Sequence, residues 1–414
     1  MKITDQICDP QTWKRFWEYR LESRHISQKD AEDLYLFYRN EEYLKTVELV
    51  KCGGTFNPPT KKTISKIYSE KKRIVYTFNR EENYVLKLIT YLLIRKYDNL
   101  FAPNLYSFRL NNGAHTALPY LTSGHRTDKM YVYKTDISNY FNSVDVTKLL
   151  PILSEILVDD ADLFVFIKNL LEDPRVVDNG QIVEEKKGIM AGCPLAAFLA
   201  NVYLRELDWS FYKSDSIYAR YSDDIIIFSP TLQIRDVCIQ QVKNFLQYKD
   251  LTINTKKEQF VLPGGKWEFL GFSYSAGKVD ISDVSAEKLK KKMRRKARAL
   301  IRWKNKKGAD GPRAARAFIK VFNKKLFDNP VDDELTWSRW YFPIINTVDT
   351  LREIDHYEQD CIRYIATEKR TKSRFNFSYG DMKKLGYRGL VHEYYRIHKD
   401  KVKAEKNSQK MGND

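Results

Sequence analysis

The chain has 414 residues, which is long enough for a large hydrophobic core and two or three domains. Lysine and arginine number 71 against 54 aspartates and glutamates, and this surplus of 17 positive charges is typical of a protein with a polyanionic partner. No disulfide framework, zinc site or membrane span is predicted, because the five cysteines are widely spaced and no apolar run approaches roughly 18 residues, and the polar N-terminus predicts a cytoplasmic protein.

Residues 1–55 are predicted to form a helical extension. Apolar residues recur there at the three- to four-residue spacing of one helix face, namely Trp13, Phe16, Trp17 and Leu21. The pairs Gly53-Gly54 and Pro58-Pro59 mark the end of this region. We interpret the extension as a contact for RNA or for a protein partner.

Three carboxylates end or interrupt predicted β-strands. The apolar run over residues 132–135 ends at Asp136, and an aromatic pair follows at Tyr140 and Phe141. Further along, residues 221–224 read Tyr-Ser-Asp-Asp between a predicted strand and a run of three isoleucines and a phenylalanine. Two adjacent aspartates are usually a solvated turn, but a turn between buried strands is a much more specific setting.

The setting of these aspartates predicts a metal site. Unpaired carboxylates beside buried strands are costly unless something neutralises them. Two strands, one ending at Asp136 and one turning at Asp223 and Asp224, can bring the three side chains together. This is the ligand set of a two-metal phosphoryl-transfer site, with ions about 3.5–4 Å apart. Hard oxygen ligands suit Mg²⁺, so we predict two Mg²⁺ ions, with Mn²⁺ as the substitute.

A strongly basic helix is predicted over residues 288–307. Twelve of these 20 residues are lysine or arginine. An apolar stripe at helical spacing runs through it, formed by Leu289, Met293, Ala297 and Leu300. A glycine- and proline-containing break follows at 308–312. A charge run by itself usually indicates only a solvated helix face.

Together these motifs resemble the reverse transcriptases, and most closely the bacterial group II intron and retron branch. Residues 221–224 match the family's Tyr-x-Asp-Asp motif, and residues 132–141 match its first palm motif. Three more segments follow in the family's order, at residues 188–204, 251–257 and 267–272. The resemblance covers roughly residues 60 to 275.

The resemblance implies an α+β fold of the right-hand polymerase type, with fingers, a palm built on an antiparallel sheet, and a helical thumb. We therefore expect the fingers after the helical extension, then the palm, the thumb, a further helical region and a disordered tail. The expected boundaries are 1–55, 56–130, 131–275 (with 146–187 partly rejoining the fingers), 276–330, 331–398 and 399–414.

The resemblance also implies roles at the catalytic centre. Asp136, Asp223 and Asp224 would be catalytic and would bind metal, with the backbone carbonyl of Ile137 as a further ligand. Phe141 would be the steric gate that screens the sugar 2′ position, so the implied substrates are dNTPs. Other dNTP contacts are expected in the basic run 71–73 of the fingers and elsewhere in the family motifs, at Lys72, Arg73, Arg109, Gly192 and Lys257.

Two further elements would grip nucleic acid. The Phe-Leu-Gly hairpin at Phe269, Leu270 and Gly271 resembles the family's primer grip. The basic helix directly after the palm would lie on the template–primer duplex and contact phosphates, which makes binding sequence-independent and salt-sensitive. The expected contacts are Lys291, Arg294, Arg295, Arg298 and Arg302. The implied partners are a template RNA and the cDNA product, and the oligomeric state is left open.

Departures from the family pattern indicate a more specific relationship. Ala191 replaces the usual glutamine of a Pro-Gln-Gly motif, and Ala196-Ala197 replaces a Ser-Pro pair. With the helical extension, these features resemble the bacterial "unknown group" reverse transcriptases, with the type 2 defence-associated class preferred. That class implies copying of a dedicated non-coding RNA in anti-phage defence, in the bacterial cytoplasm.

Two alternatives remain open at this stage. The first is template-independent or protein-primed DNA synthesis, as in abortive-infection relatives. The second is a non-catalytic RNA-binding scaffold, although its aspartates would then have no catalytic reason to be intact. Sequencing the product separates the first alternative from RNA-directed synthesis, because only a templated product copies an RNA.

Overall fold

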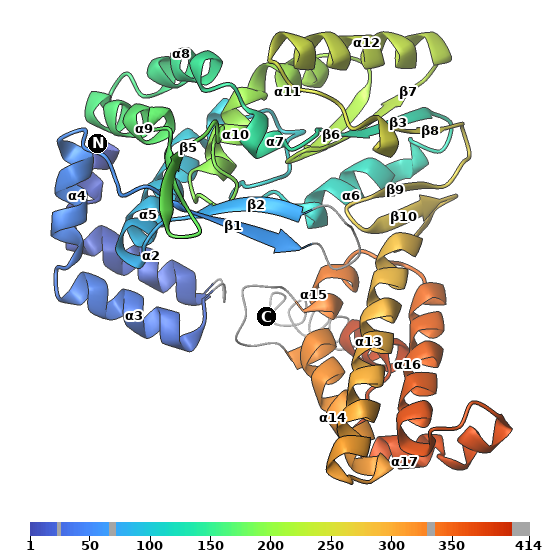
Figure 1. The fold of residues 1–414 in the computed structure, drawn as a ribbon. Coiled ribbons are helices and arrows are strands. Elements are labelled where there is room, and N and C mark those ends of the chain that lie inside the picture. Colours follow the sequence, from blue (N-terminus) through green and yellow to red (C-terminus); the bar gives the residue numbers. More distant parts are fainter. Residues whose placement is uncertain (23–25, 66–71, 329–335, 400–414) are drawn as a thin grey trace, which may run out of the picture. The chain divides into compact units, whose positions relative to one another are not determined.

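The structure is a computed structural model that describes residues 1–22, 26–65, 72–328 and 336–399 (Figure 1). The predicted tail over 400–414 and the first residue of the basic run, Lys71, lie outside the described residues. The chain divides into two compact units, Met1–Gly265 and Lys266–Asp414. Helices and mostly antiparallel strands build both units, which confirms the predicted α+β class.

The helical extension is part of the core of the first unit. Trp13 and Phe16 are buried in the same apolar cluster as residues of the later helices. The buried carboxylate of Asp160 accepts hydrogen bonds from the backbone N–H groups of Ile3 (2.5 Å) and Thr4 (3.0 Å), so it caps the first helix. The extension consists of α1 (Ile3–Gln6), α2 (Pro10–Glu22), α3 (Gln28–Arg39) and α4 (Tyr43–Lys51).

A mixed sheet lies in the segment predicted as fingers. Its strand order is β2-β1-β4-β5, and all neighbours are antiparallel except β1 and β4, which pair in parallel at Thr60 and Val177. The strands are β1 (Thr60–Ser65), β2 (Lys72–Thr77), β4 (Arg175–Asp178) and β5 (Gln181–Glu184). The helices of this region are α5 (Arg80–Tyr97), η1 (Asp98–Leu100), α6 (Ala114–Thr122), η2 (Ser123–His125), α7 (Tyr140–Ser143), α8 (Val146–Ile156) and α9 (Ala161–Glu172).

An antiparallel sheet with the order β6-β7-β3-β8 carries the three aspartates. Its central strands are buried because they consist of isoleucine, valine and aromatic residues. The helix α12 packs against β3 and β7, and α11 packs against β6 (Figure 1). The elements are β3 (Tyr131–Asp136), α10 (Ala196–Tyr203), α11 (Arg205–Tyr212), β6 (Ile217–Tyr221), β7 (Asp224–Ser229), α12 (Leu232–Tyr248), η3 (Thr255–Lys257) and β8 (Gln259–Val261).

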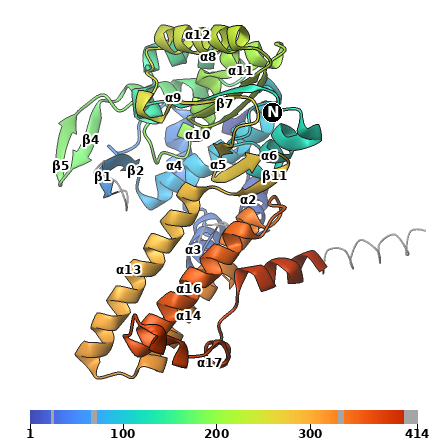
Figure 2. The same cartoon turned by 90° about the vertical axis from the view of Figure 1, so that its right-hand side faces the viewer.

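The second unit begins with a small antiparallel sheet and continues as helices. The long helices α13, α14 and α16 lie side by side (Figure 2). The predicted apolar stripe of α13 is buried, and the helix ends at Gly308 (φ +63°), as the sequence break predicted. The elements are β9 (Trp267–Phe269), β10 (Phe272–Ser275), β11 (Lys278–Ile281), α13 (Asp283–Lys307), α14 (Gly311–Asn323), η4 (Lys324–Asp328), α15 (Trp337–Tyr341), α16 (Asp349–Thr367), η5 (Lys372–Asn376) and α17 (Tyr379–Lys384).

Residues 390–399 are also helical, and the start of this segment is held by α16. The buried carboxylate of Asp355 accepts hydrogen bonds from the backbone N–H groups of Leu390 (2.7 Å) and Val391 (3.0 Å). Glycine suits the tight approach at Gly389, because a Cβ there would lie 3.2 Å from the Asp355 carboxylate. None of the helices in the described part of the chain combines the length and the apolar character needed to cross a membrane.

Candidate active site

The three predicted aspartates lie at one end of the palm-type sheet. Asp136 at the end of β3 is directly opposite Asp224 at the start of β7. Ser222 and Asp223 form the two-residue loop of the β6–β7 hairpin, since Tyr221 pairs with Asp224. Ser222 has a positive φ of +60°, as the first central residue of a type II′ turn does. The backbone N–H of Ile137 donates to the carbonyl of Asp223 (3.1 Å), which ties the turn to β3.

Burial perturbs two of the carboxylates at this end of the sheet. Burial raises the pKa of Asp223, and the neighbouring Asp136 raises it further, while Lys257 and Arg73 act in the opposite direction. Burial likewise raises the pKa of Asp224 to about 6, against the lowering effect of Lys134. Both shifts disfavour the charged carboxylates, so a positive charge at this end of the sheet would be stabilised.

Lys257 supplies one such charge in the structure. Its ammonium group lies 2.6 Å from the Asp136 carboxylate, and its side chain is 54% exposed whereas that of Asp136 is only 9% exposed. The backbone N–H of Asn254 donates to the carbonyl of Asp136 at 2.8 Å. The 254–257 segment therefore brings the predicted pyrophosphate-side lysine to Asp136.

The fit of these residues to Mg²⁺ depends on their chemistry. Within the described residues, no group of three His, Cys, Asp or Glu side chains stands in an arrangement that holds a metal ion. The oxygen donors nevertheless suit a hard cation, and the buried like charges of Asp136, Asp223 and Asp224 are what a divalent ion would neutralise. Metal ligation by these three residues and by Ile137 stays a prediction.

The predicted gate residue, Phe141, lies on the short helix α7. The ring of Phe141 is partly buried and meets Phe108 edge-to-face, with centroids 6.3 Å apart. The loop that contains Gly188 and Gly192 packs against the backbone of Phe141 and Tyr76. A Cβ on Gly188 would lie 2.5 Å from the Phe141 carbonyl, and one on Gly192 would lie 2.8 Å from the Tyr76 carbonyl. Both glycines have positive φ, so this close packing requires them.

Ala191, at the position of the family's glutamine, is held by its backbone. Its N–H donates to the Asn142 side chain (2.8 Å), and its carbonyl accepts from the Tyr76 N–H (2.8 Å) on β2. The 188–193 loop thus links the gate to the fingers strand that carries Lys72 and Arg73. These bonds need no particular side chain at 191, which explains how the loop folds without the glutamine.

Comparison with known families decides what this arrangement is. Residues 61–274 match the family described as Reverse transcriptase (RNA-dependent DNA polymerase), which is more than half of the chain. The chain belongs to this family. No curated protein sequence matches it significantly.

Solved telomerase structures are similar to this chain. Apo telomerase from Candida tropicalis aligns at 12% identity with a TM-score of 0.48, covering 80% of this chain and 59% of that chain. A C-terminally truncated form aligns at 14% identity with a TM-score of 0.45, covering 55% of each chain. Telomerase from Candida albicans in complex with the TWJ fragment of telomeric RNA aligns at 12% identity with a TM-score of 0.43. This alignment covers 81% of this chain and 67% of that chain. The chain thus spans little more than half of the first two.

The predicted triphosphate-binding cations differ in their surroundings. Lys72 and Arg73 are exposed on β2, and Arg73 is close enough to lower the pKa of Asp223. Arg109 is instead committed to a two-pronged ion pair with Asp98 (2.9 and 2.8 Å) and to the carbonyl of Ala102 (2.8 Å). This gives Arg109 a structural role, and its predicted nucleotide contact would require the ion pair to open.

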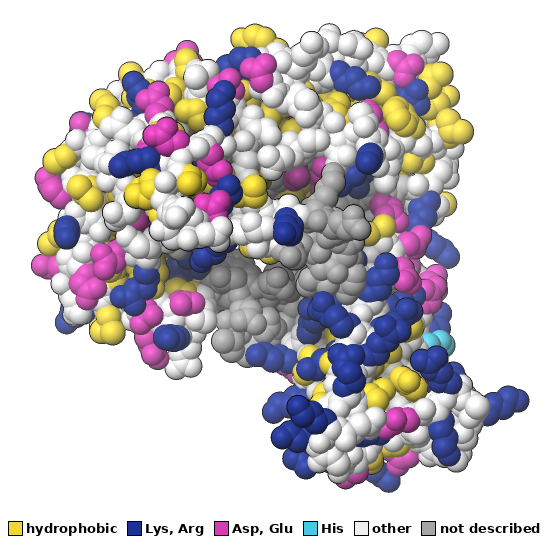
Figure 3. All heavy atoms as spheres, viewed as in Figure 1, with side chains coloured by type: hydrophobic (Ala, Val, Ile, Leu, Met, Phe, Trp, Pro, Cys, Tyr) yellow, Lys and Arg dark blue, Asp and Glu magenta, His cyan; other side chains and the backbone are white. Residues whose placement is uncertain are grey.

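The predicted nucleic-acid elements lie in the second unit. Leu270 and Gly271 form the tight turn between β9 and β10, both with positive φ. A Cβ on Gly271 would lie 2.8 Å from the Tyr341 hydroxyl, so the turn favours glycine there. Figure 3 shows lysine and arginine side chains gathered on this unit. The five predicted phosphate-binding residues of α13 lie along its solvent-accessible faces, namely Lys291, Arg294, Arg295, Arg298 and Arg302.

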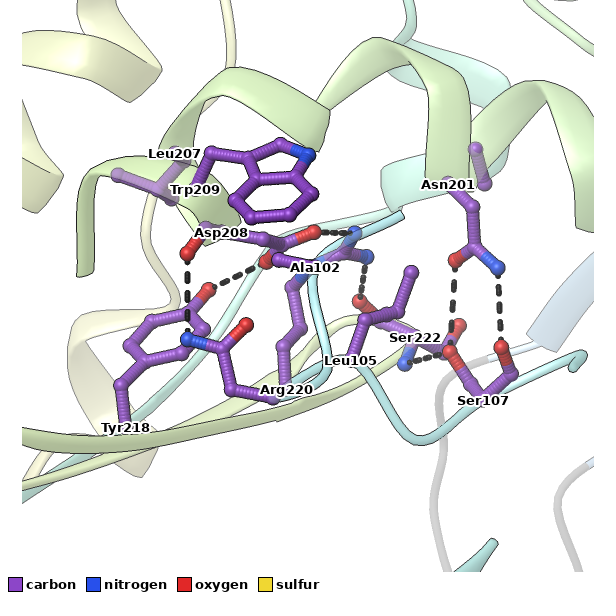
Figure 4. Close-up of polar contacts among 12 residues, drawn as sticks. Ala102, Leu105, Ser107, Asn201, Leu207, Asp208, Trp209, Tyr218, Arg220 and Ser222 are labelled. Carbon is purple, nitrogen blue, oxygen red and sulfur yellow. Dashed lines mark hydrogen bonds and ion pairs between the residues drawn. The ribbon is translucent and has the colours of Figure 1, made fainter. Parts of the chain in front are cut away.

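A buried polar network beneath the Tyr-Ser-Asp-Asp turn was missed in the sequence (Figure 4). Arg220 and Asp208 form an ion pair with both side chains 0% exposed, at 2.8 and 2.5 Å. Tyr218 also donates to Asp208, at 2.9 Å. One signal was present, because an arginine inside an otherwise apolar strand must find a buried partner. Nothing in the sequence indicated that the partner is Asp208.

Proposed function

We propose that the protein is an RNA-directed DNA polymerase that adds dNTPs to a primer 3′-OH. The observation that carries this proposal is the pairing of Asp136 with Asp224 across β3 and β7, with Asp223 in the adjoining turn. These positions are those of the family's catalytic motifs. The proposed substrates are dNTPs, which the protein would add to a primer paired with an RNA template.

In this mechanism, Asp136, Asp223 and the Ile137 carbonyl would hold Mg²⁺, with Asp224 completing the site electrostatically. Bound Mg²⁺ would lower the pKa of the primer hydroxyl and neutralise charge on the leaving pyrophosphate. The chain's own residues position the substrates. Arg73 would bind the triphosphate, and Phe141 would exclude a ribose 2′-OH.

Lys257 has a second role in the proposed mechanism. In the structure its ammonium group is bound to Asp136. If Asp136 held a divalent ion, the exposed Lys257 side chain would be free to place its charge near the leaving pyrophosphate. Catalysis of this kind rests on positioning and charge neutralisation, because phosphoryl transfer requires little covalent chemistry from the protein.

The test uses the full chain purified with the RNA that accompanies it. The protein is incubated with dNTPs and Mg²⁺, and any DNA product is sequenced. DNA complementary to a bound RNA, absent from the Asp223→Asn variant and retained in the exposed Asp236→Asn control, is the expected result. A homopolymer or random product would establish template-independent synthesis instead. No DNA from the parent, with equal RNA binding by both proteins, would support the scaffold alternative.

We also propose a finer role on the basis of the family resemblance. The departures at Ala191 and Ala196-Ala197 and the helical extension support a place among the bacterial defence-associated reverse transcriptases, with a dedicated non-coding RNA as template. In that case the same sequencing experiment returns one RNA rather than a mixture. A product that copies many unrelated RNAs would contradict the dedicated template while leaving the polymerase activity intact.

A further inference from the structure

We propose that the buried Arg220–Asp208 ion pair, together with Ser107, is a positioning device for the catalytic turn. It holds the backbone of Ser222 from both sides and so fixes Asp223, the next residue along the chain. This inference rests on the proposed function, because it assigns roles within the same site. None of these side chains is a metal ligand or a substrate contact in the proposed mechanism.

Both backbone polar groups of Ser222 are bound by buried side chains. The Arg220 guanidinium donates from Nη1 to the Ser222 carbonyl at 3.0 Å. The Ser222 N–H donates to the Ser107 hydroxyl at 2.8 Å. Figure 4 shows the two contacts converging on Ser222 from different parts of the chain. A turn residue held in this way cannot rotate its peptide groups without breaking a buried hydrogen bond.

Ser222 needs this support because of its backbone conformation. Its φ of +60° is in the left-handed region, which is uncommon for residues other than glycine and asparagine. Strained backbone of this kind persists only where the surroundings over-determine it, and it is concentrated at functional sites. A glycine at 222 would relieve the strain but would also free the turn that carries Asp223.

The device is anchored in two helices. Asp208 lies on α11 and is itself held by the Tyr218 hydroxyl, while Asn201 on α10 donates to the Ser107 carbonyl at 2.9 Å. The Ser107 hydroxyl lies 3.4 Å from the Asn201 side-chain oxygen. The catalytic turn is therefore held in place by contacts to α10 and α11 as well as by its own strands.

Stability alone does not explain the ion pair. Burying two charges completely is expensive, and replacing such a pair with apolar residues of similar volume is often neutral or stabilising. An apolar core would lack one thing, which is a donor for the Ser222 carbonyl. The function of the pair can thus be separated from its contribution to folding.

The first experiment replaces the charged network with apolar residues. The variant Asp208→Leu/Tyr218→Phe/Arg220→Met removes both charges and the hydroxyl that would otherwise lose its acceptor. We expect it to unfold at a temperature close to that of the parent. Its kcat for dTTP addition on poly(rA) with an oligo(dT) primer should fall by about 10- to 100-fold, with little change in KM, because positioning is lost. A folded triple variant with parental kcat overturns the proposal.

A second readout does not depend on activity. Mn²⁺ binding to the free protein is measured by the electron paramagnetic resonance of the unbound ion. We expect the affinity to fall by about 10-fold in the triple variant, as is typical when support of a ligand is lost. A merely structural role would leave the affinity of the folded fraction unchanged. If the parent binds Mn²⁺ but makes no DNA, the proposed function fails, and the Mn²⁺ comparison still tests the positioning device.

The third variant approaches Ser222 from the other side. Ser107→Ala removes the acceptor of the Ser222 N–H, together with the longer 3.4 Å contact to Asn201, and should lower kcat and Mn²⁺ affinity in the same direction. Ser216→Ala is the matched control, since Ser216 is a buried serine just before β6 that contacts Ser229 and Cys238. The control should keep parental values. If the triple variant fails to fold, the Ser107→Ala variant tests the proposal by itself. Parental kcat and Mn²⁺ affinity in the Ser107→Ala variant would refute it.

Discussion

At the scale of single residues, the environment of each side chain determines its chemistry. Asp136, Asp223 and Asp224 have the same carboxylate, yet Lys257 contacts only the first, and burial raises the pKa of the other two. Arg109 and Arg73 are both fingers arginines, but the first is bound to Asp98 and the second acts on Asp223. Residue type alone therefore does not identify which cation serves the substrate.

Phe141 gives a direct prediction about substrate choice. Phe141→Val should raise the incorporation of ribonucleotides relative to deoxynucleotides by about 10- to 100-fold, since the loss of a steric wall in a pocket is worth a factor of this size. Single-nucleotide extension with UTP and with dTTP opposite adenine measures the ratio. Phe164→Val, at a partly buried phenylalanine on α9, is the control. An unchanged ratio would show that Phe141 does not screen the sugar.

Glu358 predicts a pH dependence of stability. It is 1% exposed on α16, and one of its carboxylate oxygens has no hydrogen-bond partner among the described residues. Burial beside Asp355 raises its pKa well above the usual value. The folded state therefore retains a proton that the unfolded chain loses above about pH 4.3. The free energy of unfolding must fall as the pH rises from there towards the folded-state pKa, with a limiting slope of about 1.4 kcal/mol per pH unit.

The variant Glu358→Gln isolates this effect. It has a similar shape and no titrating group, so it should match the parent near pH 4.5 and exceed it increasingly towards pH 8. Urea unfolding of both proteins across this range measures the difference. A parallel pair of curves would mean that Glu358 is ionised and solvated in the folded protein.

At the scale of elements, capping contacts decide how distant segments join. Asp160 starts α9 and also caps α1, so a single carboxylate ties the N-terminal extension to a helix more than 150 residues away in the sequence. Asp355 does the same for the helical residues 390–399 in the second unit. The 188–193 loop joins β2 to Phe141 through backbone hydrogen bonds.

The α1 cap can be tested by removing one carboxylate. Asp160→Ala should lower the free energy of unfolding by about 2–4 kcal/mol, because the N–H groups of Ile3 and Thr4 lose their buried acceptor. Hydrogen exchange should speed up in residues 3–8 before the rest of the unit. Asp162→Ala, at an exposed position two residues along, should change stability by less than about 0.5 kcal/mol. Equal effects of the two changes would contradict the capping role.

At the scale of the whole molecule, charge and apolar surface are divided between two units. The first unit contains a core that extends from α1 to α12, with the three aspartates at the end of one sheet. The second unit places arginines and lysines along α13 while its apolar stripe packs against the neighbouring helices. Much of the surplus of 17 positive charges therefore lies on the surface formed by α13.

This surface predicts the salt dependence of template–primer binding. Each phosphate contact contributes about 0.7–0.9 to the slope of log K against log salt. Arg295→Ala/Arg298→Ala should therefore weaken binding equally for unrelated sequences and reduce the slope by about 1.4–1.8. Fluorescence anisotropy across a salt series measures both quantities. A control pair is Arg352→Ala/Lys384→Ala, whose cations are ion-paired in the same unit. An unchanged slope in the α13 variant would exclude phosphate contacts there.

The sequence by itself determined the chemistry of this protein and much of its pattern. Strand alternation, the aspartates and the break after the basic helix follow local rules of burial, turn formation and helix termination, so they could be predicted from short segments. The apolar stripe of α13 was predictable for the same reason, because helical periodicity is a local property.

Only the tertiary structure decided which residues meet. Buried or partly buried polar contacts join separate segments, namely Arg220 with Asp208, Ser107 with Ser222, Arg109 with Asp98, and Asp160 with the first helix. A charge or a hydroxyl in a sequence shows that a partner is needed if it is buried, but long-range packing selects that partner. The Tyr-Ser-Asp-Asp motif can therefore be recognised in the sequence, while the network that holds it is seen only in the folded chain.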